Sequence, residues 1–370
     1  MYVRDALHGN VYLNNIEKEI IDTKSFQRLV YIRQLAFAYL VYPGATNTRL
    51  EHSIGTMHVA KELARNMFGD CEEELAIAGL VHDIGHPAFS HASEDALRKY
   101  LKEDHEKRSI EIIKNGDISE VLEKFKIDKK KVLGFLQGKN KGDIISGSLG
   151  ADRIDYLMRD SLHIGVAYGI IDYNRIKDKL LFYNKKLSIY EEGLQGAESL
   201  LIARYFMYET VYLHHTVRIV ENMYKKALEL AIESGKFNPK ELYADDYTII
   251  KRLNEIDESK FIMNKIMERK LFKRVYYNNV KERIDLEEIK SVLEKAGIKK
   301  EEFIITLDNM GGHMESIPVV NKKHDFIGNL NEVSPLINTL ESTMKNKNTL
   351  IVAVEKSKIE KVRRALQKVL

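Results

Sequence analysis

Apolar and charged residues recur with a helical period over most of the 370-residue chain. Residues 72–86 illustrate the pattern, because acidic residues open an apolar run that stops at Gly85 and Pro87, in agreement with the helix dipole and with the usual helix terminators. Apolar side chains alternate with charged ones in the same way elsewhere. We therefore predict a mainly α fold with long helices over residues 53–68, 72–86, 149–165 and 198–235.

Strand-like segments are rarer and lie mostly near the end of the chain. Residues 10–13 and the hairpin-like 186–193 are the two before residue 240, and 303–307 and 349–355 follow it. This change in the pattern of strand-like segments predicts a helical core over residues 1–237 and a smaller C-terminal α+β lobe over 238–370. We expect the lobe to pack on the core or to take part in oligomer contacts. Gly311, Gly312 and His313 fall in what we interpret as an ordinary loop between strands.

Composition limits the classes of protein to consider. A hydrophobic fraction of 44% and a charged fraction of 31% suit a packed globular chain. The net charge of +3 is too balanced to indicate nucleic acid by itself. A single cysteine, Cys71, excludes an internal disulfide and suits a reducing compartment. Neither a signal peptide nor a membrane-spanning run is recognisable, so we expect a cytoplasmic protein with no membrane partner.

The chemistry begins with GLVHDIGHPAFSH, residues 79–91, which places His82 beside Asp83 at the end of an apolar helix. An imidazole nitrogen and a carboxylate oxygen together suit a divalent metal ion. The alternative is a pair of buried polar groups that merely satisfy each other, and for an isolated His–Asp dipeptide we favour that alternative.

Residues on two other predicted helices favour the metal site over the buried polar pair. His52 lies at the start of one predicted helix, and Asp152 lies on another. Asp152, Tyr156, Asp160 and His163 recur at helical spacing and therefore share one face. Such a face makes a poor core and a good pocket wall, so we predict that a site lies beside it.

These segments resemble the HD superfamily of metal-dependent phosphohydrolases. The family pattern H…HD…D is matched by His52, His82, Asp83 and Asp152. The segments DALHGNVYL, SFQRLVYIRQL, YPGATNTRLEHSIG, GLVHDIGHPAFSH and DRIDYLMRD also follow one another in the order seen in the deoxynucleoside triphosphate triphosphohydrolase branch, which includes the SAM-and-HD-domain proteins. The resemblance implies an HD-domain helical core and hydrolysis at the α-phosphate.

The resemblance also implies roles for the catalytic residues. The H…HD…D residues would bind one divalent metal ion per site (Mg, Mn, Fe, Zn, Ni or Co), which would orient or deprotonate the attacking water. His105 would be the general acid for the departing 5′ oxygen, because the pKa of histidine lies near neutrality. His91 would lie beside the phosphate with Glu94 orienting it, and Arg49 would contact the reacting phosphate. The resemblance assigns no single role to His86. It would support a metal ligand from behind, contact a phosphate, or fix the loop by a hydrogen bond.

Substrate contacts follow from the same resemblance. Arg153, at a position that is lysine in some members, and Arg204 would bind the triphosphate. Gln34 and Leu35 would read the base or sugar, Asp160 would bind the 3′ hydroxyl, and Tyr156 would exclude a 2′ hydroxyl. Tyr212 would pack on the sugar or base, although core packing of Tyr208 and Tyr212 is an equal alternative. On one continuous helix, Arg204, Tyr208 and His215 would lie within about 40° of one another.

Regulation and assembly are expectations by analogy. Asp22 and Gln27 match two of three positions of a regulatory nucleotide site in relatives, but Val30 replaces the third, an arginine. A homo-oligomer, dimer or tetramer, is expected on the same basis.

Two alternatives to a dNTP triphosphohydrolase stay open. The first is another HD nucleotidase or phosphodiesterase, against which Arg49, Arg153 and Arg204 favour a polyphosphate. The second is a nucleic-acid-binding protein with a vestigial site, which we do not favour, because every metal ligand is intact and the basic runs at 129–131 and 268–279 are more typical of solvated faces.

Overall fold

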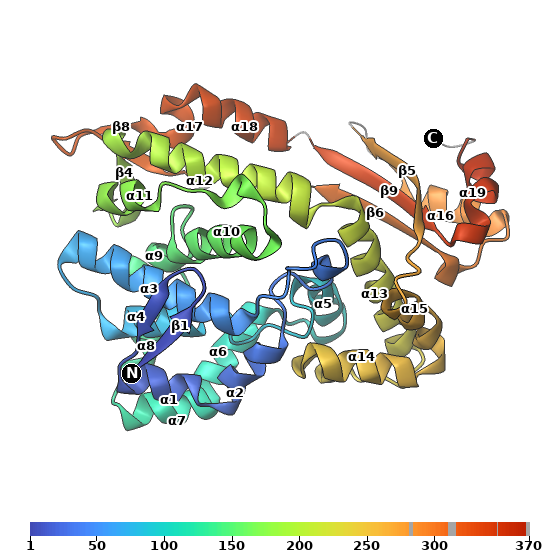
Figure 1. The fold of residues 1–370 in the computed structure, drawn as a ribbon, viewed down its shortest axis with the longest axis horizontal. Coiled ribbons are helices and arrows are strands. Elements are labelled where there is room, and N and C mark those ends of the chain that lie inside the picture. The colour runs from blue at the N-terminus through green and yellow to red at the C-terminus, as the bar shows by residue number, and fades with distance from the viewer. Residues whose placement is uncertain (281–283, 310–315, 346, 368–370) are drawn as a thin grey trace.

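The computed structural model describes residues 1–280, 284–309, 316–345 and 347–367, and Gly311, Gly312 and His313 lie outside that part of the chain. The centre of the N-terminal region is a group of three packed helices, α3 (Arg49–Phe68), α4 (Glu73–Val81) and α10 (Ala151–Ile164) (Figure 1). Their apolar faces are fully buried. Shorter helices surround them, namely α1 (Asn15–Ile21), α2 (Lys24–Gln27), α5 (His91–Ala96), α6 (His105–Asn115), α7 (Asp117–Lys124), α8 (Lys129–Leu136), α9 (Asp143–Ser146) and α11 (Tyr173–Lys179).

Local sequence signals set the ends of the central helices. Thr48 and Glu51 form a capping box at the start of α3, and Gly69, with a φ of 81°, closes its end in the left-handed region. Helix α4 ends at Val81, so His82 and Asp83 lie in the turn just beyond it. The side chains of His82 and Asp83 are therefore free to point away from the axis of α4.

The predicted single helix over 198–235 is wrong. The structure contains two helices, α12 (Leu194–Met207) and α13 (His215–Glu233), separated by a π-helical turn at Tyr208–Tyr212. A π turn inserts an extra residue into the helical repeat and shifts the phase of everything after it. Extended backbone at His214 then restarts the chain as the N-cap of α13. Arg204 and His215 consequently do not share one helical face.

Three small sheets accompany the helices, and the four segments predicted as strands are confirmed. The antiparallel hairpin of β1 (Tyr2–Asp5) and β2 (Gly9–Tyr12) lies against the central helices. A second sheet has the order β3 (Leu180–Tyr183), β4 (Lys186–Tyr190), β7 (Pro318–Val320) and β8 (Phe326–Asn329), with β4 and β7 parallel. A third is antiparallel, in the order β5 (Lys273–Asn279), β9 (Asn348–Val354) and β6 (Phe303–Asn309).

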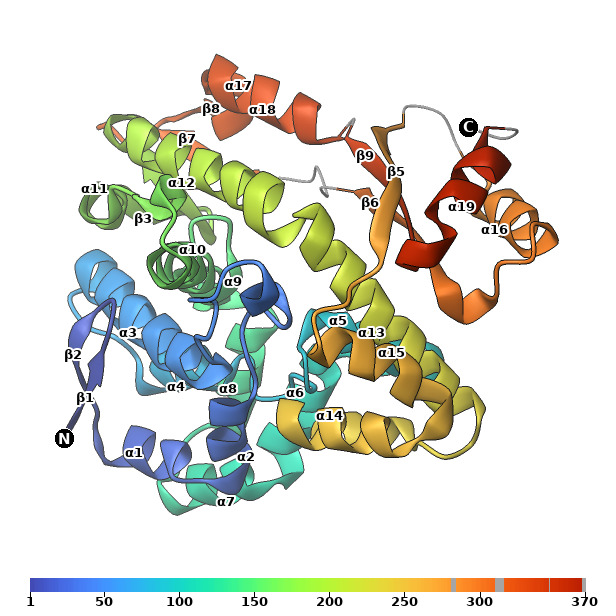
Figure 2. The same cartoon turned by 45° about the vertical axis from the view of Figure 1, so that its right-hand side comes forward.

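The C-terminal part is α+β, which confirms the predicted fold class, but its elements pack in three different places (Figure 2). Helices α14 (Asp246–Glu255) and α15 (Asp257–Met267) pack near α13, and one apolar cluster joins Phe37, Phe89 and Tyr224 to Ile249 and Ile262. Helices α17 (Leu330–Val333) and α18 (Pro335–Lys345) lie along α12, whereas α16 (Leu286–Lys295) and α19 (Ile359–Leu366) cover the third sheet. Packing thus continues across residue 237, where we expected a boundary.

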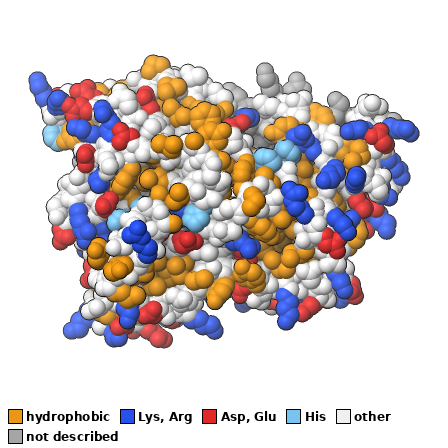
Figure 3. Space-filling view, in the orientation of Figure 1, with side chains coloured by type: hydrophobic (Ala, Val, Ile, Leu, Met, Phe, Trp, Pro, Cys, Tyr) orange, Lys and Arg blue, Asp and Glu red, His pale blue; other side chains and the backbone are white. Residues whose placement is uncertain are grey.

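The surface carries both signs of charge. Basic and acidic side chains are interspersed over the face shown in Figure 3, with apolar patches between them. None of the described helices combines the length and the apolar character that a bilayer-spanning segment requires.

Candidate active site

A cavity of about 370 Å³ lies between the central helices and α13. Its wall mixes apolar side chains with histidines, carboxylates and arginines. Residues from six separate segments of the chain meet there, and they include most of those predicted from the sequence. The predicted residues that line the cavity are Gln34, Leu35, Arg49, Asp83, His91, His105, Asp152, Tyr156, Asp160 and Tyr212.

The four H…HD…D residues converge, and two of them, Asp83 and Asp152, line this cavity. The Nε2 of His52 lies 3.0 Å from Asp152 Oδ1 and 3.8 Å from Asp83 Oδ2. The Nε2 of His82 lies 3.4 Å from Asp83 Oδ1 and 3.7 Å from Asp152 Oδ1. Two imidazole nitrogens and two carboxylates thus point at one small volume, and His52, His82 and Asp83 have ligand atoms close enough to hold a metal ion.

Hydrogen bonds behind the two histidines set their tautomers. His82 Nδ1–H donates to the carbonyl of Gly79 at 2.9 Å, so its Nε2 is an acceptor, and that buried atom has no hydrogen-bond partner. His52 Nδ1–H donates to Asp155 Oδ2 at 2.8 Å. Metal-binding histidines commonly donate their second N–H to a carboxylate or carbonyl in this way. The donor set and the unpartnered Nε2 therefore fit a divalent cation.

Electrostatics at His52 favour positive charge. Burial alone lowers the pKa of this histidine, but hydrogen bonds to Asp152 and Asp155 outweigh burial and raise it to about 10. A position at which carboxylates stabilise a proton so strongly also stabilises a metal cation, and the two compete for the same nitrogen.

Asp155 was missed by the sequence interpretation. It is fully buried and accepts hydrogen bonds from His52, from Arg159 Nε at 2.9 Å and from His8 Nε2 at 2.6 Å. Arg159 also donates to Asp5 at 2.8 Å. The N-terminal hairpin is thereby connected to the metal-facing histidine. A signal was present, because Asp152 and Asp155 are three residues apart on the predicted helix.

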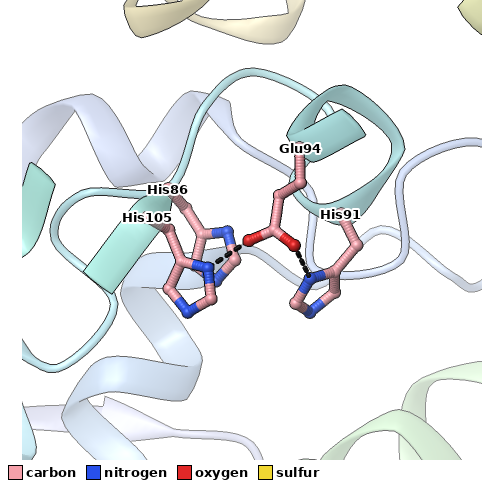
Figure 4. A group of neighbouring side chains, drawn as sticks. All are labelled: His86, His91, Glu94 and His105. Carbon is pink, nitrogen blue, oxygen red and sulfur yellow. Dashed lines mark hydrogen bonds and ion pairs between the residues drawn. The ribbon is translucent and has the colours of Figure 1, made fainter. Parts of the chain in front are cut away.

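Figure 4 shows a second group of side chains, which consists of His86, His91, Glu94 and His105. The Glu94 carboxylate accepts a short hydrogen bond from His105 Nδ1 and lies 3.3 Å from His91 Nδ1. The ring of His86 stacks on that of His105, with centroids 4.0 Å apart, and its Nε2 lies 3.4 Å from Asp83 Oδ1. These four residues also have ligand atoms close enough for a cation. Because Glu94 already joins two imidazoles, the arrangement suits proton sharing.

The pKa values in this second group follow from the shared carboxylate. Burial lowers the pKa of His105, but the hydrogen bond to Glu94 outweighs burial and raises it above its ordinary value. Burial would raise the pKa of Glu94, yet its bonds to His105 and His91 hold it far below the usual range. His86 is different, because burial and the nearby Arg49 hold its pKa well below the ordinary value. His105 is thus the better proton donor, and His86 is held neutral.

The turn that carries His91 is strained and tightly anchored. Phe89 and Ser90 have φ values of 57° and 49°, which are uncommon for residues other than glycine. The Phe89 amide donates to Asp246 Oδ1 at 2.7 Å, and its ring stacks on Phe37 with centroids 4.3 Å apart. Ser90 Oγ accepts from Arg49 Nε at 2.9 Å. Backbone strain of this kind persists because the surrounding contacts stabilise it, and it is typical of functional turns.

Guanidinium groups surround the cavity. Arg49 is buried and pairs with Asp83. Arg153 and Arg204 do not line the cavity wall itself, but both approach Tyr156 closely enough to lower its pKa, although burial raises that pKa overall to about 12. Arg204 lies over the ring of Tyr208 at 5.3 Å. Its Nε and NH1 atoms, like NH1 of Arg153, are buried and find no hydrogen-bond partner in the part of the chain that the structure describes. Such donors are matched by an anion.

The opposite side of Tyr156 carries a polar group of three residues. Asp160 accepts from Asn47 Nδ2 at 2.8 Å and from the hydroxyl of Tyr212 at 2.9 Å. Burial raises the pKa of Asp160 to about 6, against the effect of these two donors. The ring centroids of Tyr156 and Tyr212 are 6.4 Å apart, and the two rings meet edge to face.

Besides His52, His82, Glu94, Arg153 and Arg204, three further residues singled out from the sequence do not line the cavity. The last residue of the predicted polar stripe, His163, lies 3.9 Å from Glu51 and is absent from the lining. Asp22 is exposed and lies 3.9 Å from Lys18. The Gln27 amide donates to the carbonyl of Ile21 at 2.9 Å, which uses this side chain within its own segment.

Comparisons with known proteins agree with this geometry. Residues 49–159 match the HD domain, and residues 171–370 match the HD associated region. An uncharacterized protein of Methanocaldococcus jannaschii is 36% identical over 98% of this chain and 80% of its own length. A deoxynucleoside triphosphate triphosphohydrolase SAMHD1 homolog of Dictyostelium discoideum is 29% identical over 74% of this chain, which spans 59% of that relative. A hypothetical protein from Aquifex aeolicus has a similar crystal structure, with a TM-score of 0.82, 30% identity and 99% coverage of both chains.

Proposed function

This chain belongs to the HD-domain family of metal-dependent phosphohydrolases. We propose that it hydrolyses deoxynucleoside triphosphates to deoxynucleoside and inorganic triphosphate. One observation carries the proposal. Carboxylates of the metal-binding set and the proton-donating histidine line one cavity, and guanidinium groups near it carry buried N–H donors that no described residue satisfies. The similarity to the deoxynucleoside triphosphate triphosphohydrolase SAMHD1 homolog supports the choice of substrate.

The residues that hold the metal are His52, His82, Asp83 and Asp152. When bound, a divalent cation in this position neutralises phosphate charge and lowers the pKa of a water molecule. The chain prepares for it through Asp155 and Gly79, which accept from Nδ1 of His52 and His82 and so leave both Nε2 atoms directed at Asp83 and Asp152. Little reorganisation is then needed at the moment of reaction.

His105 is our choice for the proton donor to the departing 5′ oxygen. It lines the cavity, and Glu94 bonds its Nδ1, so its Nε2 is the nitrogen left for substrate. The raised pKa keeps the imidazolium populated near neutral pH, as a general acid requires. His91 shares the same carboxylate and, with an exposed side chain, is placed to contact phosphate oxygens.

The triphosphate would be bound by Arg153 and Arg204, which carry buried N–H donors that no described side chain or backbone group satisfies. Deoxyribose would stack on Tyr156, with Asp160 accepting from the 3′ hydroxyl. Asp160 is held in place by Asn47 and Tyr212, so its position does not depend on substrate. Gln34 and Leu35 complete the nucleoside side of the cavity.

Product analysis tests this proposal. Protein loaded with Mn²⁺ is incubated with each dNTP and each NTP, alone and in pairs, and the products are separated by anion exchange. We expect triphosphate and deoxynucleoside in equal amounts, and little turnover of ribonucleotides. Incubation with two nucleotides together tests whether a second nucleotide is required for activity. Release of phosphate or pyrophosphate without triphosphate would overturn the proposal in favour of another phosphohydrolase activity.

A further inference from the structure

Two charged residues on α13 line the active-site cavity without any part in the chemistry described above. Arg218 and Glu221 are three residues apart on this helix, and both contribute to the cavity wall. Among the described residues, Arg218 pairs with Glu221 and Asp308, and neither Arg218 nor Glu221 bonds to the metal-facing residues or to the group around Glu94. Charged groups in a cavity wall are costly unless they are paired or bind a ligand.

The Arg218 side chain is fixed from two directions. Its NH1 donates to Glu221 Oε2, and its NH2 donates to Asp308 Oδ1 at 2.6 Å. Asp308 lies on β6 with only 4% of its side chain exposed, and Thr306 donates a further hydrogen bond to it at 3.1 Å. The guanidinium therefore has little freedom to move, and it holds the Glu221 carboxylate in one place.

The surroundings of this pair suit a flat, mainly apolar ring. Leu35, Ala36 and Phe89 line the cavity from one set of loops. Leu213, in the turn before α13, and Val217, at the start of α13, also line it. An apolar slot with a few fixed polar groups is the usual design of a site that recognises a small molecule.

We infer that Arg218 and Glu221 recognise the nucleobase of the substrate and select guanine. An ionised carboxylate only accepts hydrogen bonds. Guanine presents N1–H and its 2-amino group side by side, and so offers two donors to one carboxylate. Adenine and cytosine place a ring-nitrogen acceptor beside their amino group, and thymine flanks its N3–H with two carbonyls, so each of these would face the carboxylate with a repelling lone pair.

This inference rests on the proposed function for the orientation of the nucleotide, with phosphates at the metal and base toward α13. The alternative is that the pair only ties β6 to α13. That alternative predicts a change in stability on substitution and no change in base preference.

The test compares base preference in the wild type and in Glu221→Gln, which keeps the size of the side chain and removes its charge. We expect the wild type to prefer dGTP over dATP, and dGTP over dITP, which lacks the 2-amino group, by about tenfold or more in kcat/KM. Glu221→Gln should lose about tenfold of the preference for dGTP over dATP. The matched control, Glu229→Gln, changes a glutamate of α13 that pairs with Lys99 outside the cavity and should retain the preference.

Equal turnover of dGTP and dITP by the wild type, or an unchanged base ratio in Glu221→Gln, overturns the inference and leaves the proposed reaction standing. Calorimetric titration with dGMP and dAMP separates the two proposals, because it needs no turnover. Tighter binding of dGMP that is lost in Glu221→Gln supports base selection even if no triphosphate is released. Equal binding of both monophosphates counts against it.

Discussion

Asp155 Oδ2 lies 2.8 Å from Nδ1 of His52, on the side of the imidazole ring that faces away from the cavity. Three more donor atoms, one from His8 and two from Arg159, hold the same carboxylate. Asp155 therefore fixes both the orientation of His52 and the nitrogen that carries the proton. The Nε2 of His52 is thereby directed at Asp152 Oδ1, 3.0 Å away, by a residue that does not itself line the cavity.

Replacing Asp155 with Asn should weaken metal binding. An amide can place its NH₂ group toward His52 Nδ1, which favours the other tautomer and removes the negative charge behind the ring. Loss of such an outer partner typically costs about 10- to 100-fold in metal affinity. Titration calorimetry with Mn²⁺ measures this, with Asp178→Asn on the exposed side of α11 as the control. Wild-type affinity in Asp155→Asn would show that the carboxylate has no influence on the ligand.

Replacing Asp83 with Ala should abolish metal retention and activity together. Asp83 also pairs with Arg49, which is only 3% exposed, so the substitution leaves a buried guanidinium unpaired. Breaking a buried pair in this way costs about 3–5 kcal/mol of stability. Urea unfolding and elemental analysis of the purified variant measure the two effects separately. A folded variant with full activity would refute the assigned site.

Much of this architecture is predictable from the chain, and the exceptions have physical reasons. Apolar periodicity locates α3 and α10 because each has one face in the core, and the H…HD…D residues stand out because their ligand chemistry is rare. The break at Tyr208–Tyr212 is not visible, since these residues continue the helical pattern and only tertiary packing selects the π turn.

Contacts between distant segments are the other part that could not be predicted. His8 reaches Asp155 from 147 residues away, and no local pattern marks that bond. The same holds for Asp246, whose carboxylate anchors the turn at Phe89 from the far side of the expected domain boundary. Residue type pointed to the proposed ligands, whereas the residues that hold those side chains in place emerged only from the fold.

The pH dependence of turnover should reveal the link between Glu94 and His105. The carboxylate raises the pKa of His105, so the acid form persists to higher pH. Glu94→Gln removes the charge, which lowers that pKa, and the alkaline fall in kcat should move to lower pH. A profile of kcat from neutral to alkaline pH measures the shift, with Glu120→Gln, exposed on α7, as the control. An unmoved alkaline limb would exclude His105 as the group that Glu94 tunes.

Arg204 should contribute to binding of the polyphosphate rather than to folding. Its Nε and NH1 atoms are buried and have no hydrogen-bond partner among the described residues, so its removal breaks no ion pair that the structure describes. A charged hydrogen bond is worth about 1.5–3 kcal/mol, so Arg204→Ala should lower kcat/KM by roughly tenfold or more. Arg363→Ala on α19, where Arg363 pairs with Glu360 in exposed positions, is the control. Equal kinetics for both variants would place the triphosphate elsewhere.

Gly55 should be essential for the geometry behind His52. A Cβ atom at this position would lie 2.0 Å from Asp155 Oδ1 and 2.3 Å from Arg159 NH2, so neither partner could keep its place. Overpacking of this kind costs about 1–3 kcal/mol, and displacement of Asp155 should also weaken Mn²⁺ binding. Thermal unfolding and titration calorimetry test Gly55→Ala on both counts. Gly134→Ala is the matched control, because Gly134 lies within α8 with no atom within 4 Å of an added Cβ. Alanine there should stabilise the helix by up to about 1 kcal/mol and leave Mn²⁺ affinity unchanged. If both variants behaved alike, the close approach of α3 and α10 at Gly55 would have no role in positioning the metal-binding histidine.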